Sequence, residues 1–165
     1  MNLVDTQREV LIRRMRAFFH DNPRFVDHAL DVLANAEAIR ILEGGDATTI
    51  TAAALLHDVG IPTAERKYGS AAGVYQEQEG PPLARAIMAD LGLDTATIGH
   101  VCDIIADHHT GERMDSLEFR ILWDADQLAN IPDERDDETP AARRAYIQQV
   151  FRTTAGRAIA LDALA

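Results

Sequence analysis

Apolar residues recur along this chain at intervals of three and four positions, which is the spacing of one face of an α-helix. The pattern runs through nearly all of the 165 residues, and no run of four to eight residues alternates as a half-buried strand would. Hydrophobic residues make up 47% of the chain, which is enough to build a core. The sequence therefore predicts an all-α fold of about six to eight helices in a single domain, residues 1–165.

Helix start and stop signals divide this pattern into segments. A first apolar stripe ends near the sequence DNP, and a second ends at the glycine pair that precedes a capping aspartate, Asp46. The polar, glycine-rich segment from Gly60 to Gly80 predicts a functional or partly helical excursion. Further helices are expected from Pro81 to about Leu91, Asp94 to His109, Ser116 to Ile131 and, after an acidic linker at 132–140, over 140–165.

The sequence AALLHDVGIP places a histidine and an aspartate, His57 and Asp58, at the end of an apolar helix. Gly60 and Pro62 are stop signals for that helix. Because the helix is apolar on most sides, we expect Asp58 to be shielded from bulk water. An ionised carboxylate in that position costs several kcal/mol unless a cation or hydrogen-bond donors compensate it.

Other polar residues interrupt apolar stripes elsewhere. His28 lies on the stripe of the second helix, His108 and His109 end a later one, and Asp126 is in line with apolar positions of another. Each has an ordinary explanation, since a lone histidine is more often a hydrogen-bonded core residue and Asp126 can pair with an arginine. Together with His57 and Asp58 they predict a divalent cation site, because imidazole and carboxylate suit such ions.

Charge and cysteine content narrow the possible partners. The net charge is −11, with 27 acidic and 16 basic residues, which disfavours binding to polymeric nucleic acid or an anionic membrane. Cys102 is the only cysteine, so no intrachain disulfide can form. The first residues resemble no signal peptide, and no apolar run approaches the roughly 20 residues of a membrane span. These features predict a cytoplasmic protein.

The four positions His28, His57, Asp58 and Asp126, in the segments RFVDHALDV, LLHDVG and ILWDADQL, resemble the HD-domain superfamily of metal-dependent phosphohydrolases. The resemblance covers about residues 24–131, and it matches Asp126 rather than Asp124. It implies an HD-type helical domain in which these residues bind one or two divalent ions (Mn, Fe, Co, Mg or Zn). A hydroxide bound to the metal would then attack a phosphate ester or anhydride.

The segment from IIADHH to DADQL further resembles HD proteins that hydrolyse dinucleoside tetraphosphates, which implies a nucleotide or dinucleotide substrate. Neighbouring residues on a helix point about 100° apart, so His108 and His109 would serve two ions bridged by Asp58. Alternatively, only one of these histidines has a buried role. Where the dinuclear pattern has a further histidine this chain has Gln76, and Glu79, or else Glu77, is expected to replace it.

A basic residue often follows the doublet in this superfamily, and here that position is Ile61. Arg66 and Lys67, the only lysine, are the nearest candidates to bind a substrate phosphate, with ordinary surface charge as the alternative. Asp58, Glu65 or Glu79 is expected to move protons, with Lys67 as a further catalytic candidate. The rival function is a non-catalytic regulatory module that binds metal or nucleotide. The C-terminal helix is expected either to cover the site or to form a homodimer.

Overall fold

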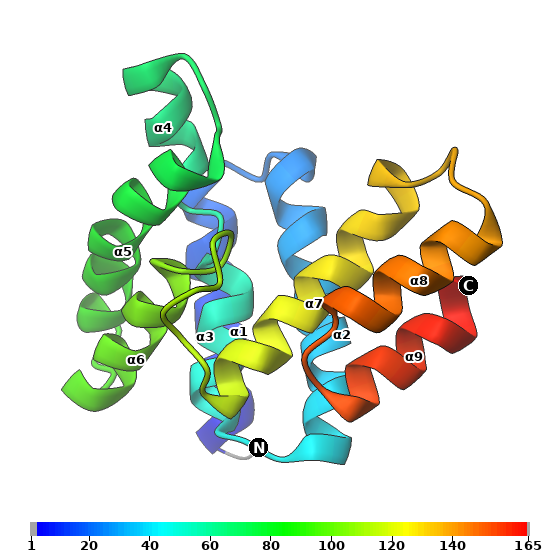
Figure 1. Cartoon of the computed structure of the whole chain (residues 1–165). Helices are drawn as coiled ribbons and strands as arrows, with labels where there is room; N and C mark the ends of the chain where they lie inside the picture. The colour runs from blue at the N-terminus through cyan, green and yellow to red at the C-terminus, as the bar shows by residue number, and fades with distance from the viewer. Residues whose placement is uncertain (1–2, 165) are drawn as a thin grey trace.

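Nine helices build the part of the chain that the structure, a computed structural model, describes, which is residues 3–164 (Figure 1). In chain order the helices are α1 (Leu3–Phe18), α2 (Pro23–Glu43), α3 (Ala47–Leu56), α4 (Ile61–Tyr68), α5 (Gly73–Asp90), α6 (Thr95–Ile105), α7 (Leu117–Glu134), α8 (Pro140–Val150) and α9 (Thr154–Leu164). The all-α class is confirmed. None of these helices is both long and apolar enough to cross a membrane.

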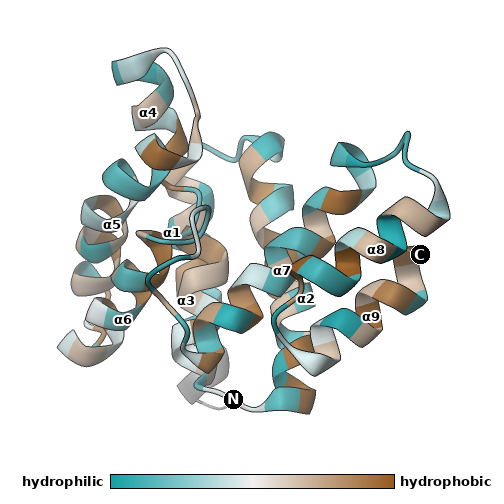
Figure 2. Cartoon of the chain, viewed as in Figure 1, coloured by the Kyte–Doolittle hydropathy of each residue, from teal (hydrophilic) through white to brown (hydrophobic). Residues whose placement is uncertain are grey.

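The short helix α3 lies at the centre of the fold and contacts α1, α2, α6 and α7. Every residue from Thr49 to Leu56 is buried, and most of them carry small side chains that let the surrounding helices approach closely. The expected cap is present, because the carboxylate of Asp46 accepts a hydrogen bond from the Thr49 backbone N–H at 2.7 Å. In Figure 2 the loop between α6 and α7 is largely hydrophilic, whereas hydrophobic residues line the contacts between helices.

The segment from Gly60 to Gly80 is more helical than its composition indicates. It contains all of α4 and the first two turns of α5, so Pro81 and Pro82 lie inside α5 instead of starting a helix. A close approach between Gly60 and Gly80 explains the position of this first part of α5. A Cβ atom on Gly60 would lie 2.7 Å from the Gln76 carbonyl oxygen and 2.8 Å from the Gly80 nitrogen. The turn after α3 therefore packs directly on the α5 backbone.

Helix α6 ends at Ile105, four residues earlier than its apolar stripe predicts, and residues 106–110 form turns. His108 and His109 therefore come from a turn, in which the 100° separation of a regular helix does not apply. Helix α7 continues through Pro132 to Glu134, so the acidic linker is shorter than expected.

The expected C-terminal helix is divided in two, α8 and α9. Between them the carboxylate of Asp124 in α7 accepts hydrogen bonds from the backbone N–H groups of Arg152 and Thr153, both at 2.8 Å. The Thr153 hydroxyl donates to the same carboxylate at 2.6 Å. Because these backbone groups bind the buried Asp124, the helix is interrupted after Val150, and α9 begins at Thr154.

Candidate metal centre

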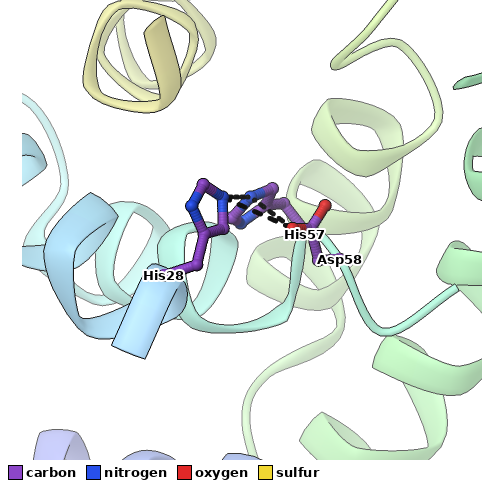
Figure 3. Close-up of side chains that lie close together, drawn as sticks. All are labelled: His28, His57 and Asp58. Carbon is purple, nitrogen blue, oxygen red and sulfur yellow. Dashed lines mark hydrogen bonds and ion pairs between the residues drawn. The ribbon is translucent and has the colours of Figure 1, made fainter. Parts of the chain in front are cut away.

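Three helices and one turn bring four of the expected ligands together. His28 lies near the start of α2, His57 is the C-terminal cap of α3, Asp58 follows in the next turn, and Asp126 lies in the middle of α7. Figure 3 shows His28, His57 and Asp58 pointing toward one another. These residues meet because α2, α3 and α7 pack against each other.

Five separations between donor atoms of these four side chains are nearly equal. His28 Nε2 is 3.3 Å from His57 Nε2 and 3.1 Å from Asp126 Oδ1. The Oδ2 atom of Asp58 is 3.4 Å from His28 Nε2 and 3.3 Å from His57 Nε2. His57 Nε2 is 3.4 Å from Asp126 Oδ1.

This spacing fits a single ion. Ligand atoms about 2.1 Å from a cation, at angles of about 90–110° to each other, are separated by roughly 3.0–3.4 Å. The donor set of two imidazoles and two carboxylates suits a divalent transition metal. The residues present therefore fit the bound cation that the sequence predicts.

The tautomer of His57 supports the same assignment. Its Nδ1 atom lies 2.9 Å from the carbonyl oxygen of Ala54, which can only accept, so Nδ1 carries a proton. In the neutral ring Nε2 then has a lone pair that faces the oxygens of Asp58 and Asp126. A lone pair opposite two carboxylates is stable only if a proton or a cation lies between them.

The protonation of the cluster without metal follows from its charges. Burial opposes the charged form of His57, but the carboxylates of Asp58 and Asp126 outweigh it and raise the pKa of His57 well above its usual value. Burial also opposes ionisation of Asp58, yet His57 and His108 hold the pKa of that carboxyl well below its usual range. Burial also raises the pKa of Asp126, but hydrogen bonds from His28 and His57 outweigh it and lower that pKa. A proton on His57 thus occupies the place of a cation.

A second group of possible ligands lies on the other side of Asp58. It consists of Asp58, His108 and His109, whose candidate ligand atoms lie within 4.8 Å of one another. His108 Nδ1 lies 2.7 Å from the carbonyl oxygen of Ile105, and His108 Nε2 lies 3.7 Å from Asp58 Oδ1. That Nε2 atom is buried and has no hydrogen-bond partner among the residues that the structure describes. An orphaned buried nitrogen beside a carboxylate is what a ligand position would leave without its ion.

Gln76 occupies the place where the dinuclear pattern has a histidine. Its amide nitrogen donates to the carbonyl oxygen of Ala71 at 2.7 Å, which turns Oε1 toward the imidazole of His109, 3.0 Å from Nε2. The His109 ring is also packed tightly against Gly73, where a Cβ atom would lie 2.7 Å from the histidine Cβ. Desolvation, together with the neighbouring charge of His108, lowers the pKa of His109 to about 4. His109 is therefore neutral at pH 7, and because Gln76 Oε1 can only accept, the proton is on Nε2 and the lone pair is on Nδ1.

Comparison with known proteins agrees with this geometry. The family model described as the HD domain matches residues 25–131, a range that contains His28, His57, Asp58 and Asp126. This chain belongs to the HD-domain superfamily. The similarity to the HD superfamily that the sequence motifs indicate is thus confirmed.

A solved structure shares the fold of this HD-domain protein over nearly its whole length. It is the crystal structure of a predicted HD superfamily hydrolase from an uncultured Thermotogales bacterium, with a TM-score of 0.70 and 29% sequence identity. The match covers 98% of this chain and 90% of the other. No curated protein matches this chain.

The two glutamates considered as replacements for a histidine at position 76 have other contacts in this HD-domain protein. Glu79, the expected metal ligand, accepts from Lys67 Nζ and from the Tyr68 hydroxyl, both at 2.8 Å. Glu77 accepts from the backbone N–H groups of His109 and Thr110 at 2.9 and 2.7 Å. Glu79 therefore does not take the place of a histidine ligand in this structure, because both of its carboxylate oxygens bind residues of α4. Glu77 instead fixes the turn that carries His109.

The expected phosphate-binding and catalytic residues of α4 do not gather at the cluster either. Lys67 is paired with Glu79, and Arg66 donates to the Thr63 hydroxyl at 3.3 Å. Arg66 also borders a hollow lined by Phe18, Phe19 and Leu83, on the α1 side. Glu65 accepts from the guanidinium of Arg24 at 2.9 Å.

Two residues that support the site are missing from the sequence-based expectations. Asn130 donates to Asp126 Oδ1 at 3.1 Å, and the signal was its position four residues later on the same helix face. Asp107 is buried and accepts from the backbone N–H groups of Arg113 and Met114, which shapes the loop after the histidine pair. The sequence feature that indicates Asp107 is its position directly before the two histidines, at the end of an apolar stripe.

Proposed function

We propose that this HD-domain protein is a metal-dependent phosphohydrolase that cleaves a phosphate ester or phosphate anhydride of a small, nucleotide-like molecule. The observation that carries the proposal is the set of five donor separations of 3.1–3.4 Å among His28, His57, Asp58 and Asp126. The HD-domain match and the hydrolase label of the similar structure support the same class. A nucleotide substrate rests on the resemblance of the second half of the chain to the subgroup that acts on dinucleoside tetraphosphates.

The residues have distinct tasks in this proposal. His28, His57, Asp58 and Asp126 hold the cation, and Asn130 orients the Asp126 carboxylate. When bound, the cation supplies Lewis-acid polarisation of the phosphoryl group and activation of water. Asp58 lies beside His57 on one side and His108 on the other. It is therefore the carboxylate that we assign to proton transfer at the site.

We propose that a second ion binds more weakly than the first. Its ligands would be Asp58, His108 and His109, completed by the Oε1 atom of Gln76. An amide oxygen carries no charge and is a harder donor than imidazole, so it favours Mn²⁺ or Mg²⁺ over softer ions.

A specific observation favours the rival function, a regulatory module that binds without turnover. Ile61 takes the place of a basic residue and packs into the core, and Gln76 takes the place of a histidine ligand. A panel of nucleotides and dinucleoside polyphosphates with Mn²⁺, Co²⁺ and Mg²⁺ separates the two functions. We expect release of phosphate from at least one compound, whereas thermal stabilisation without turnover would establish the binding module.

Two variants link any activity to the cluster. His57→Ala and Asp58→Ala each remove one ligand, so purified protein should lose its metal and its turnover together. Metal analysis that finds either variant fully occupied would show that the ligand assignment is wrong.

A further inference from the structure

The ligands of the first candidate ion site differ in their exposure, and His109 in the second group is exposed as well. The side chains of His57 and His108 are 1% and 2% exposed, whereas His28, Asp58 and Asp126 retain 22%, 16% and 13% exposure. Solvent, and therefore a substrate, approaches along α2 and α7, over His28 and Asp126.

Arg24 lies beside this opening. It precedes His28 by four residues on α2, so the two side chains lie one above the other on the same face of the helix. Its guanidinium reaches α4, the helix that follows the His57–Asp58 turn, and lies 2.9 Å from a carboxylate oxygen of Glu65. The Arg24–Glu65 ion pair thus connects α2, which carries His28, with the helix that follows the His57–Asp58 turn.

This ion pair can be exchanged at little cost. The side chains are 59% and 40% exposed, and ion pairs in such surroundings contribute little to stability. Phosphate can accept two hydrogen bonds from the guanidinium at once, whereas the contact with Glu65 is a single bond at 2.9 Å. The other basic residues considered for this role lie against other parts of the fold, since Lys67 pairs with Glu79 of α5 and Arg66 borders the hollow on the α1 side.

Building on the function proposed above, we propose that Arg24 binds a phosphate group of the substrate and that Glu65 is its counter-ion in the free protein. Arg24 then provides the positive charge that Ile61 does not. Glu65 is released when phosphate binds and becomes available to accept a proton at the edge of the site.

Binding of inorganic phosphate to the Mn²⁺-loaded protein, measured by calorimetry, tests this role. Arg24→Ala should weaken phosphate binding by roughly 10- to 100-fold while Mn²⁺ affinity stays unchanged, because one charge-assisted contact is lost. Glu65→Gln should tighten it by about two- to fivefold, because the competing carboxylate is gone. Arg14→Ala is the matched control. Arg14 on α1 forms a similarly exposed ion pair, at 2.7 Å, with Asp90 on α5.

The outcomes are distinguishable from failure of the hydrolase proposal. If wild type binds phosphate or turns over a substrate, and Arg24→Ala changes neither phosphate affinity nor KM, the role of Arg24 is refuted and the hydrolase stands. If Glu65→Gln weakens binding, the counter-ion role is refuted. If wild type with Mn²⁺ neither binds phosphate nor hydrolyses any compound of the panel, both proposals fall.

Discussion

Two aspartates lie two positions apart on α7 and have different surroundings. Asp126 faces His28 and His57, whereas Asp124 is fully buried and accepts three hydrogen bonds from Arg152 and Thr153. Residues two apart on a helix point about 200° apart, so only one of them can face the cluster.

Replacing each aspartate by asparagine separates these tasks. Asp126→Asn should weaken Mn²⁺ binding by at least about 100-fold, because a charged ligand is lost. Asp124→Asn should leave Mn²⁺ affinity intact but lower the free energy of unfolding by about 1–3 kcal/mol, because its NH₂ group must face a backbone donor. Calorimetric titration and urea unfolding measure the two effects. The reverse pattern would mean that the ligand has been assigned to the wrong aspartate.

The raised pKa of His57 makes the effect of metal on stability depend on pH. In metal-free protein the folded-state pKa lies above the unfolded value of about 6.5, so this stabilisation is present below pH 6.5 and is lost as pH rises through the folded pKa. The lowered pKa values of Asp58 and Asp126 contribute stability that is fully present above about pH 4 and is lost as pH falls through the folded-state pKa values.

Metal binding has the opposite pH dependence, because the cation must displace the proton from His57. The difference in Tm between Mn²⁺-loaded and EDTA-treated protein should therefore grow from pH 6 to pH 8, as measured by scanning calorimetry. In His57→Ala the difference should be small at every pH. A large difference in wild type that does not change with pH would contradict a proton on His57.

The first cluster could be predicted from sequence because His28, His57 and Asp126 interrupt apolar stripes and Asp58 ends a buried helix. The pairing of Glu79 with Lys67, and of Gln76 with His109, could not be predicted, because spacing shows which face a side chain occupies but not which partner it meets.

Among the elements, α5 departs most from its sequence signals. Its prolines are typical of a helix start, yet the helix begins at Gly73, because Gly60 and Gly80 let the α3–α4 turn pack against its backbone. Contacts between distant segments outweigh local start signals here. By contrast, the starts of α3 and α7 were predictable from their N-caps, Asp46 and Ser116.

Substitution of Gly60 tests this packing. Gly60→Ala should lower the free energy of unfolding by about 1–3 kcal/mol, because its Cβ would overlap backbone atoms of α5. Gly99→Ala is the control, since Gly99 lies in α6 with open space around it, and alanine there should be neutral or stabilising by up to about 1 kcal/mol. Equal stability of the two variants in urea would contradict the close approach of the turn and α5.

Helix α5 also carries Gln76, a ligand of the second ion in our proposal. Gln76→His should tighten the second Mn²⁺ by about tenfold or more, because imidazole replaces a neutral amide oxygen, and Gln76→Ala should weaken it. The first ion should be unaffected in both. Gln78→Ala is the control, because that glutamine donates to the Tyr68 hydroxyl instead. Titrations in which both Gln76 variants match wild type would exclude Gln76 from the site.

At the scale of the whole molecule, the chain has a net charge of −11, whereas the substrate that we propose is itself an anion. Bound cations and Arg24 would offset that charge locally, while the remaining surface repels polyanions. Helices α8 and α9 lie outside the range matched by the HD domain and pack onto α7. A homodimer and a cytoplasmic location stay predictions.

Anomalous scattering at the manganese edge, from crystals grown with excess Mn²⁺ and no chelator, tests the central claim most directly. We predict a strong peak about 2.0–2.3 Å from His28 Nε2, His57 Nε2, Asp58 Oδ2 and Asp126 Oδ1. A weaker second peak is expected between Asp58 and the His108–His109 pair. A single peak would refute the second ion and leave a mononuclear hydrolase. No peak among the first four residues would contradict the account.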